Sequence, residues 1–344
     1  MKKYNVAIVG STGAVGIEIL RCLFEFSFPF QNITLLASKR SAGKQISYHN
    51  HTFIVEELVP TSFTDIDIAF WSAGAKVSEA YMPYALQEGC INIDNTSHFR
   101  MDPKVPLIVP EVNKECLREH NGIIANPNCT TIQMVSALYP LHKEFTITKI
   151  IVSTYQAVSG AGHAGMTELY SQSREILDGK KPTARILPCV GEKKHYPIAF
   201  NCIPQVDQFN NDNGFSKEEM KMILETQKIL QEEILINPTC VRVPVERGHS
   251  ESIYIETKQP IDLDTVFSLL KEAPGIDVYD DITNQIYPMA STFIGDPLVH
   301  IGRIRKDIKN EHALSMWVVA DQLMKGAAYN SIDIALTMIA MGLL

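Results

Sequence analysis

The fold is decided near the N-terminus by Tyr4-Asn5-Val6-Ala7-Ile8-Val9, which runs directly into Gly10-Ser11-Thr12-Gly13-Ala14-Val15-Gly16. The first of these segments is a short apolar run typical of a buried strand, and the apolar residues after the glycines recur at helical spacing. Glycines between a strand and a helix let the backbone approach a pyrophosphate, which the amides of the helix N-terminus can bind. The absence of Lys-Ser or Lys-Thr after the last glycine disfavours a nucleoside triphosphate loop. This order therefore predicts the start of a dinucleotide-binding domain.

Two patterns of apolar residues divide the rest of the chain. Before about Thr146, strand-like runs alternate with helix-like stretches, which predicts βαβ units and a parallel sheet. These runs are Ile33–Ala37, Ile66–Trp71 and Cys90–Asp94. After Thr146 the expected strands are longer and suit a mixed sheet; they are Ile147–Tyr155, Cys240–Val245 and Ser252–Thr257, with helices over Lys217–Leu235 and Ala320–Leu344. We expect an α/β fold, with an N-terminal Rossmann-type domain and a second α+β domain built on a mixed sheet.

The composition excludes several classes of protein. Of the 344 residues, 45% are hydrophobic, 19 are Gly and 18 are Pro, which rules out a disordered or collagen-like chain. The formal net charge of −8 argues against a general nucleic-acid or anionic-membrane surface, because both need a basic face. The most apolar stretch, Ile334–Leu344, is too short to span a bilayer, and we recognise no signal peptide. We therefore expect a cytoplasmic protein.

One of the seven cysteines has the surroundings of a nucleophile. Their odd number and the lack of a CxxC spacing disfavour a disulfide framework or a zinc site, and without an HExxH motif we expect no metal. Asn126-Pro127-Asn128-Cys129 precedes an apolar pattern that predicts a helix beginning at or near Cys129. A thiolate at a helix N-terminus is stabilised by the macrodipole and by free amides, so Cys129 is the candidate nucleophile.

A thiolate nucleophile also needs a proton shuttle, and His249 is the best placed of ten histidines. It follows a predicted strand in the turn Glu246-Arg247-Gly248-His249-Ser250, and catalytic side chains tend to lie in loops at strand ends. Arg242 and Arg247 nearby could bind an anionic substrate.

The end of the second predicted strand selects the nicotinamide cofactor. An acidic residue there would accept hydrogen bonds from a free ribose 2′-hydroxyl. The sequence instead reads Ala37-Ser38-Lys39-Arg40-Ser41, in which Ser38, Arg40 and Lys39 could hold a 2′-phosphate through charge-assisted hydrogen bonds. This favours NADP.

Several separated motifs together resemble the aspartate-β-semialdehyde dehydrogenase family over almost the whole chain. They are residues 10–16 and 126–131 quoted above, Ala-Ser-Lys-Arg-Ser-Ala-Gly-Lys (37–44), Ser-Thr-Tyr-Gln-Ala-Val-Ser-Gly-Ala-Gly (153–162), Glu-Arg-Gly-His-Ser (246–250) and Asp-Gln-Leu-Met-Lys-Gly-Ala-Ala (321–328). The resemblance implies an NADP-dependent enzyme that interconverts L-4-aspartyl phosphate and L-aspartate 4-semialdehyde. This reaction leads toward lysine through diaminopimelate, and toward methionine, threonine and isoleucine.

The resemblance also implies roles for individual residues. Cys129 would be the nucleophile and His249 the acid/base. The substrate would be bound by Arg242 (carboxylate), Gln156 (acyl group), Arg100 and Lys221 (phosphate) and Glu218 (amine). The implied cofactor contacts are Gly10, Thr12, Gly13, Ala14, Val15, Gly16, Ser38, Arg40, Ser41, Ser72, Ala73, Gly74, Ser159, Gly160 and Gln322. Many relatives have Asn in place of Gln322, which keeps the amide but shortens its reach.

The family's organisation implies an NADP-binding domain over residues 1–129 plus 322–344 and a catalytic and dimerisation domain over 130–321. It implies a homodimer whose contact is the second domain's sheet, and small-molecule substrates; the acidic net charge adds the expectation that the partners include no nucleic acid or membrane. Two alternatives stay open. N-acetyl-γ-glutamyl-phosphate reductase follows the same chemical plan, and a nicotinamide-sensing regulator would keep the glycine-rich turn without turnover.

Overall fold

The computed structural model describes residues 2–210 and 212–344. The chain divides into two compact units, Met1–Asn128 with Ala327–Leu344, and Cys129–Gly326. The boundaries expected from the sequence differ at Cys129 and at residues 322–326, which belong to the second unit. The returning C-terminal segment thus joins the first unit at Ala327.

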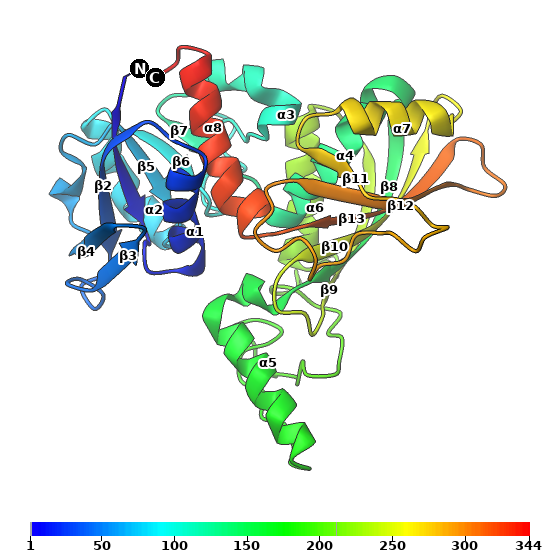
Figure 1. The fold of residues 1–344 in the computed structure, drawn as a ribbon, viewed down its shortest axis with the longest axis horizontal. Helices are drawn as coiled ribbons and strands as arrows, with labels where there is room; N and C mark the ends of the chain where they lie inside the picture. The colour runs from blue at the N-terminus through cyan, green and yellow to red at the C-terminus, as the bar shows by residue number, and fades with distance from the viewer. Residues whose placement is uncertain (1, 211) are drawn as a thin grey trace. The chain divides into compact units, whose positions relative to one another are not determined.

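The first unit is built on a seven-stranded sheet with the order β3-β4-β2-β1-β5-β6-β7 (Figure 1). Its strands are β1 (Tyr4–Val9), β2 (Phe30–Ala37), β3 (Gln45–Tyr48), β4 (His51–Glu57), β5 (Ile68–Trp71), β6 (Ile91–Asp94) and β7 (Ile123–Ala125). All neighbours are parallel except β3 and β4, which form an antiparallel hairpin. The parallel Rossmann-type sheet is confirmed, but the sequence analysis missed both the hairpin and β7.

Helices cover both faces of this sheet. They are α1 (Ala14–Glu25), α2 (Ala75–Gln87), α3 (Pro110–Asn113) and α8 (Tyr329–Ala340), with 3₁₀ turns at Pro60–Phe63 and Lys114–Glu119. α8 packs against α1 and β6, and α2 packs against β6. The apolar stretch at the C-terminus, as far as Ala340, therefore belongs to a helix that packs in the core.

The second unit is built on a six-stranded mixed sheet with the order β11-β12-β13-β10-β8-β9, as predicted. Its strands are β8 (Ile147–Gln156), β9 (Leu235–Arg242), β10 (His249–Thr257), β11 (Ile276–Val278), β12 (Val299–Lys306) and β13 (Ala313–Ala320). Its helices are α4 (Cys129–Phe145), α5 (Gly162–Leu177), α6 (Lys217–Leu230) and α7 (Leu263–Glu272), with a 3₁₀ turn at Val158–Ala161 and a π-helical turn at Met324–Ala328. The helix predicted near Cys129 is confirmed and begins at that residue.

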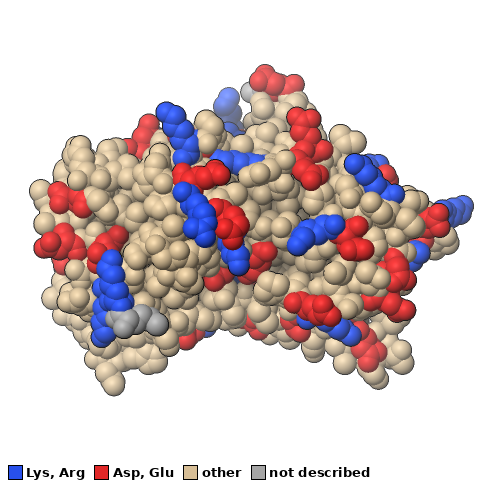
Figure 2. All heavy atoms as spheres, turned by 90° about the horizontal axis from the view of Figure 1, so that it is seen from above, with Lys and Arg blue, Asp and Glu red and all other residues tan. Residues whose placement is uncertain are grey.

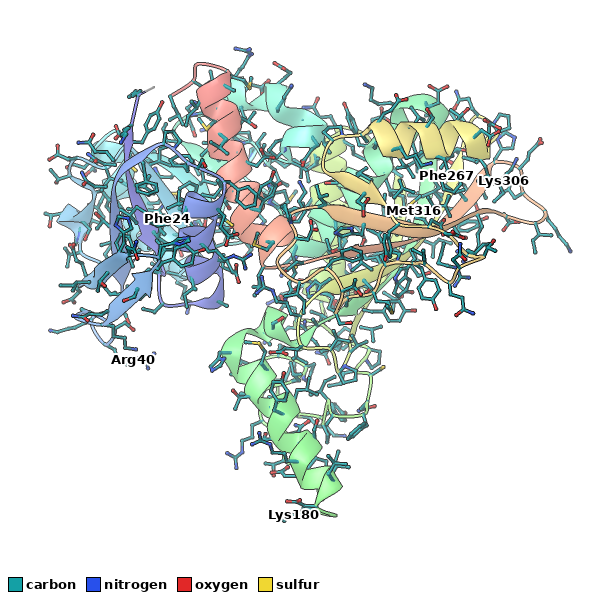
Figure 3. All side chains as sticks on the ribbon, in the orientation of Figure 1. Phe24, Arg40, Lys180, Phe267, Lys306 and Met316 are labelled. Atoms are coloured by element: carbon teal, nitrogen blue, oxygen red, sulfur yellow. The ribbon has the colours of Figure 1, made fainter. Side chains whose placement is uncertain are left out.

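One face of the mixed sheet carries the core of the second unit. Buried side chains of α4, α6 and α7 pack on this face around strand residues such as Met316. Figure 3 labels Met316 on the sheet and Phe267 on α7, which packs against the same core. α5 extends away from the sheet (Figure 1) and has its own small core around Leu169 and Leu187.

Three predicted elements of this unit have different limits. The strand predicted over Cys240–Val245 is β9, which ends at Arg242, because Pro244 has no amide to continue the ladder. The helix predicted to reach Leu235 ends at Leu230, where Gln231 adopts a left-handed conformation with φ 55°. β10 begins at His249, so this residue belongs to a strand and not to a turn.

The single long helix predicted over Ala320–Leu344 is wrong. Ala320 ends β13, and the Asp321 carboxylate then accepts the backbone amide of Leu323 at 2.9 Å. Such a local bond competes with helix formation. The helix therefore starts only after this turn, as the π-helical turn and then α8.

The surface mixes both signs of charge. On the face drawn in Figure 2, acidic and basic side chains are interspersed. Among the described residues, no helix is both long enough and apolar enough to cross a membrane.

Candidate active site

The glycine-rich turn of the first unit has the geometry of a phosphate-binding turn. Gly10 adopts φ +93°, and a Cβ there would lie 2.8 Å from the amide nitrogen of Ala73. A Cβ on Gly16 would lie 2.3 Å from the carbonyl oxygen of Gly10, so only glycine lets α1 start this close to β1. Gly13 precedes α1, and no side chain caps the first turn. The N-terminal amides of α1 thus lack a side-chain cap and fit a pyrophosphate.

A cavity of about 470 Å³ lies at the carboxyl ends of the strands of this unit. Its lining includes Gly10, Thr12, Gly13, Ser38, Ser72 and Ala73, six of the residues assigned to the cofactor from the sequence. Ala14, Val15, Gly16, Arg40, Ser41 and Gly74 belong to the same turns but do not line it. Figure 3 shows Arg40 in the loop after β2, projecting from the domain. Ser41 is buried instead, and its amide donates to the carbonyl of Ser38 at 2.7 Å.

Apart from the strand ends Val9 and Ala37, four residues that line this cavity were not expected from the sequence to lie near the cofactor. Glu57 and Leu58 lie at the end of β4, and Val77 and Tyr81 lie on α2. β4 was not predicted, so nothing indicated that Glu57 ends a strand next to β2. Val77 and Tyr81 are four residues apart on one helical face, which is a pattern that also describes ordinary core packing.

In the second unit, three candidate residues meet at one edge of the mixed sheet. Gln156 is the last residue of β8, Arg242 is the last of β9, and the two are partners in a parallel register. β10 runs antiparallel to β8 and begins with His249. The strand register thereby brings Gln156 close to Arg242 and His249, which follow it in the sequence by about 90 residues.

Arg242 is a buried cation that lacks a carboxylate partner. Its side chain donates to the carbonyl oxygen of Ala157 at 2.7 Å, and the residue is 4% exposed. Within residues 2–210 and 212–344 it forms no ion pair, and its Nε has no hydrogen-bond partner. Burial lowers the pKa of Arg242, while the negative charges of Glu218 and Cys129 oppose that effect. A buried charge of this kind is costly without an anion.

His249 is buried with a defined orientation. It is 0% exposed, and its Nδ1 accepts a hydrogen bond from the amide of Ala157 at 3.1 Å. Burial, and next the charge of Arg242, lower the pKa of His249 to about 3. The ring is therefore neutral near pH 7 and carries its proton on Nε2. A Cβ added to Gly160 would lie 3.6 Å from that Nε2, so Gly160 keeps the space in front of it open.

Glu218 and Lys221 belong to a partly buried network at the start of α6. Glu218 accepts a hydrogen bond from Gln156 at 3.1 Å and pairs with Lys221 at 3.0 Å. Lys221 also pairs with Asp207 at 2.9 Å. Burial lowers the pKa of Lys221, but Glu218 and Asp207 outweigh it, so the net shift is upward. Lys221 is thus shared by two carboxylates, and a phosphate that approaches it must compete with Asp207.

Asp207 is a member of this network that the sequence analysis missed. It lies in a loop, has a left-handed conformation with φ 67°, and precedes Lys221 by 14 residues. No local pattern connects these positions, because the contact depends on where the loop folds back onto α6.

Cys129 opens α4, and its Cβ lies close to the π-helical turn. A Cβ on Gly326 would come within 2.6 Å of the Cys129 Cβ, so only glycine fits there. The charge of Cys129 is one of the influences that raise the pKa of Arg242, so the two side chains are close enough to interact. A thiolate at Cys129, the candidate nucleophile, would thus have two favourable interactions, with the helix N-terminus and with the buried guanidinium of Arg242.

Gln322 is held by both ends of its amide. Its Oε1 accepts the amide of Gly248 at 2.8 Å, and its Nε2 donates to the hydroxyl of Ser159 at 2.5 Å. Asp321 beside it pairs with Arg247 at 2.8 Å and accepts the amide of Gly295 at 2.7 Å. Gln322 is thus bonded to a second cofactor candidate, Ser159, and to Gly248, the residue before His249.

Arg100 lies in the first unit, as do the candidates on the glycine-rich turn. It is buried and donates to the carbonyl oxygen of Asn95 at 2.8 Å. No group of three His, Cys, Asp or Glu side chains in the described chain is arranged to hold a metal ion.

Known proteins resemble this chain along both units. Residues 5–120 match a family model described as "Semialdehyde dehydrogenase, NAD binding domain", and residues 138–325 match "Semialdehyde dehydrogenase, dimerisation domain". The chain is 51% identical over 333 residues to the aspartate-semialdehyde dehydrogenase of Bacillus subtilis (strain 168), covering 96% of each chain. It is 46% identical over 346 residues to that of Aquifex aeolicus (strain VF5), covering 99% of each. A crystal structure of aspartate semialdehyde dehydrogenase II from Vibrio cholerae, complexed with ASA, matches with a TM-score of 0.94 at 44% identity over 99% of each chain.

Proposed function

Because this chain belongs to the aspartate-semialdehyde dehydrogenase family, we propose that it reduces L-4-aspartyl phosphate to L-aspartate 4-semialdehyde with NADPH. The observation that carries the proposal is the buried Arg242, which lacks a carboxylate partner and lies at the strand ends beside His249. A guanidinium in this state needs an anion, and the α-carboxylate of the substrate supplies one in bidentate geometry.

The thiolate of Cys129 attacks the carbonyl carbon of the acyl phosphate. The carbon–oxygen bond to phosphate breaks, and a thioester on Cys129 forms. NADPH supplies the hydride that reduces this thioester when it is bound. The resulting hemithioacetal then collapses, so the aldehyde leaves and the thiolate returns. In the reverse direction phosphate attacks the thioester.

His249 acts in this scheme as a hydrogen-bond donor. Its Nδ1 accepts the amide of Ala157, so the neutral ring can offer only the Nε2 proton. A donor at this position stabilises the oxyanion that develops on the substrate carbonyl in both halves of the reaction. The thiolate does not depend on His249, because the helix N-terminus and Arg242 favour it.

The network at α6 orients the substrate. Gln156 is fixed by Thr154 at 3.0 Å and by Glu218 at 3.1 Å, which suits it to position the acyl group. A carboxylate has further lone pairs, so Glu218 can also accept the substrate ammonium. We assign the phosphate group to Lys221 and to Arg100, following the family resemblance.

The preference for NADP is part of the proposal. Lys39 and Ser38 line the cavity at the end of β2, no acidic residue follows that strand directly, and Arg40 lies in the same loop. This composition suits a ribose 2′-phosphate. The cofactor fits the first unit because the glycines leave room for a pyrophosphate at the uncapped start of α1.

The second unit supports a homodimer. A cavity of about 610 Å³ on the sheet includes the exposed Tyr155, together with Trp317, Tyr287 and Met289. The matching family model is described as a dimerisation domain. A second copy of this chain is the partner that we propose for this apolar surface. We also propose a cytoplasmic enzyme of lysine (through diaminopimelate), methionine, threonine and isoleucine biosynthesis.

The test is phosphate-dependent NADPH formation by the purified protein from aspartate semialdehyde and, in parallel, from N-acetylglutamate semialdehyde. We expect the first aldehyde to be oxidised at the higher kcat/KM, and the reverse result would contradict the proposal. Cys129→Ala should abolish turnover and leave NADPH binding intact in a fluorescence titration. Unchanged turnover in that variant excludes the thioester mechanism, and binding without any turnover in the wild type favours a sensor of nicotinamide nucleotides.

A further inference from the structure

The cofactor cavity of the first unit contains an acidic side chain that the proposed reaction does not use. Glu57 ends β4 and Ala37 ends β2, and the two residues are partners in the parallel register. Both line the cavity, together with Ser38 and Lys39 from the loop after β2. Glu57 is exposed, and its side chain has no hydrogen bond or ion pair within the described chain. Its carboxylate is therefore available to a ligand.

The strand order indicates which part of a dinucleotide reaches Glu57. The pyrophosphate belongs at the turn after β1, and the ribose 2′ substituent belongs at the end of β2. β4 is the next strand outward from β2. Because neighbouring strands lie about 4.8 Å apart, the group that follows the ribose along the cofactor comes to the end of β4. That group is the adenine base.

Charge and shape favour the base as well. A carboxylate repels a 2′-phosphate dianion, whereas it accepts a hydrogen bond readily from an amino group. Leu58, Val77 and Tyr81 line the same cavity and offer apolar and aromatic surface to a planar ring. Glu57 is thus compatible with a 2′-phosphate held by Ser38 and Lys39, provided that its carboxylate faces the base.

We propose that Glu57 recognises the adenine base of the cofactor by accepting a hydrogen bond from its 6-amino group. The inference rests on the proposed cofactor-binding role of the first unit. It holds for NADP and NAD alike, because both contain adenine. It makes Glu57 a residue that determines nucleobase specificity, while the loop after β2 determines the phosphate specificity.

The experiment compares NADP⁺ with its hypoxanthine analogue, in which a carbonyl oxygen replaces the 6-amino group. For the wild-type protein we expect kcat/KM to be about tenfold lower with the analogue, as for the loss of a charge-assisted hydrogen bond. Glu57→Gln has an amide that can donate to the carbonyl oxygen, so it should use the two cofactors within about twofold of each other.

Glu56→Gln is the matched control. It removes the same charge one residue earlier on β4, where successive side chains point to opposite faces, and Glu56 does not line the cavity. This variant should keep the wild-type discrimination. Calorimetric binding of both oxidised cofactors to all three proteins repeats the comparison without turnover.

Equal use of the two cofactors by the wild type, or unchanged discrimination in Glu57→Gln, overturns the proposal. If Glu57→Gln alters the ratio of NADP⁺ to NAD⁺ use and leaves the base discrimination intact, Glu57 faces the ribose and the assignment to adenine is wrong. A wild-type protein that binds the cofactors with this discrimination but oxidises no aldehyde refutes the proposed function and leaves the role of Glu57 standing.

Discussion

Replacing Arg242 by Met separates a substrate-binding role from a structural one. Arg242 is 4% exposed and forms no ion pair within the described residues, and its guanidinium donates a hydrogen bond to the carbonyl of Ala157 at 2.7 Å. An arginine kept for stability would have a buried acidic partner, whose loss makes a deletion costly. Arg242 lacks that partner, so its desolvation cost in the unliganded protein is opposed by the charges of Glu218 and Cys129 but not by an ion pair.

The expected magnitudes follow from this geometry. Methionine fills a similar volume without charge, and replacing buried charge by apolar atoms is often neutral or stabilising by about 1–4 kcal/mol. Arg242→Met should therefore leave the melting temperature of the unliganded protein unchanged or raise it. The α-carboxylate would lose a charge-assisted, bidentate contact worth about 3–5 kcal/mol in a buried site, which corresponds to a loss of about 10²–10⁴-fold in kcat/KM.

Two measurements test this reasoning. Calorimetry gives the melting temperatures of both proteins without substrate, and the phosphate-dependent assay gives kcat/KM. Arg242→Lys is the companion variant, because it keeps the positive charge but loses the planar, bidentate donor geometry of the guanidinium. We expect its loss of kcat/KM to lie between those of the wild type and Arg242→Met. A marked drop in melting temperature with near-normal kcat/KM in Arg242→Met would refute the assignment of Arg242 to substrate.

Three further predictions concern the same two units. The pKa of His249 is lowered to about 3 on folding, so below pH 6.5 the unfolded chain binds a proton that the folded protein does not. The melting temperature should therefore fall between pH 6.5 and pH 4, and this fall should be smaller in His249→Gln. A steeper fall in the variant contradicts this sign. Gly160→Ala puts a Cβ 2.8 Å from the Arg242 guanidinium and should lower kcat/KM by about 10–100-fold, whereas Gly179→Ala, which meets no atom within 4 Å, should lower stability only. Equal activity of the two variants would exclude crowding at Arg242. Arg40→Ala should reduce the preference for NADPH over NADH by about tenfold, and an unchanged ratio of kcat/KM values removes Arg40 from the 2′-phosphate site.

The amino-acid sequence determined those features that depend on neighbours along the chain. The strand, glycine-rich turn and helix at residues 4–25 could be predicted because a short apolar run, glycine φ angles and helical spacing all act within a few residues. The start of α4 at Cys129 could be predicted for the same reason. The run after β2 predicts a 2′-phosphate site from the same kind of local pattern, and the Arg40→Ala variant tests that prediction.

Only the tertiary structure decided which distant residues meet. Gln156, Arg242 and His249 share a sheet edge through strand register, and Asp207 reaches Lys221 through a loop that folds back. Glu57 became a candidate ligand residue only because β4 pairs with β2. The residues of β4 are mostly exposed, so their sequence pattern did not predict this pairing. The break after Ala320 depends on an Asp321 carboxylate that bonds Leu323 and Arg247 at once. The strand registers and the Arg247–Asp321 ion pair join residues that are far apart in sequence, so local periodicity does not predict them.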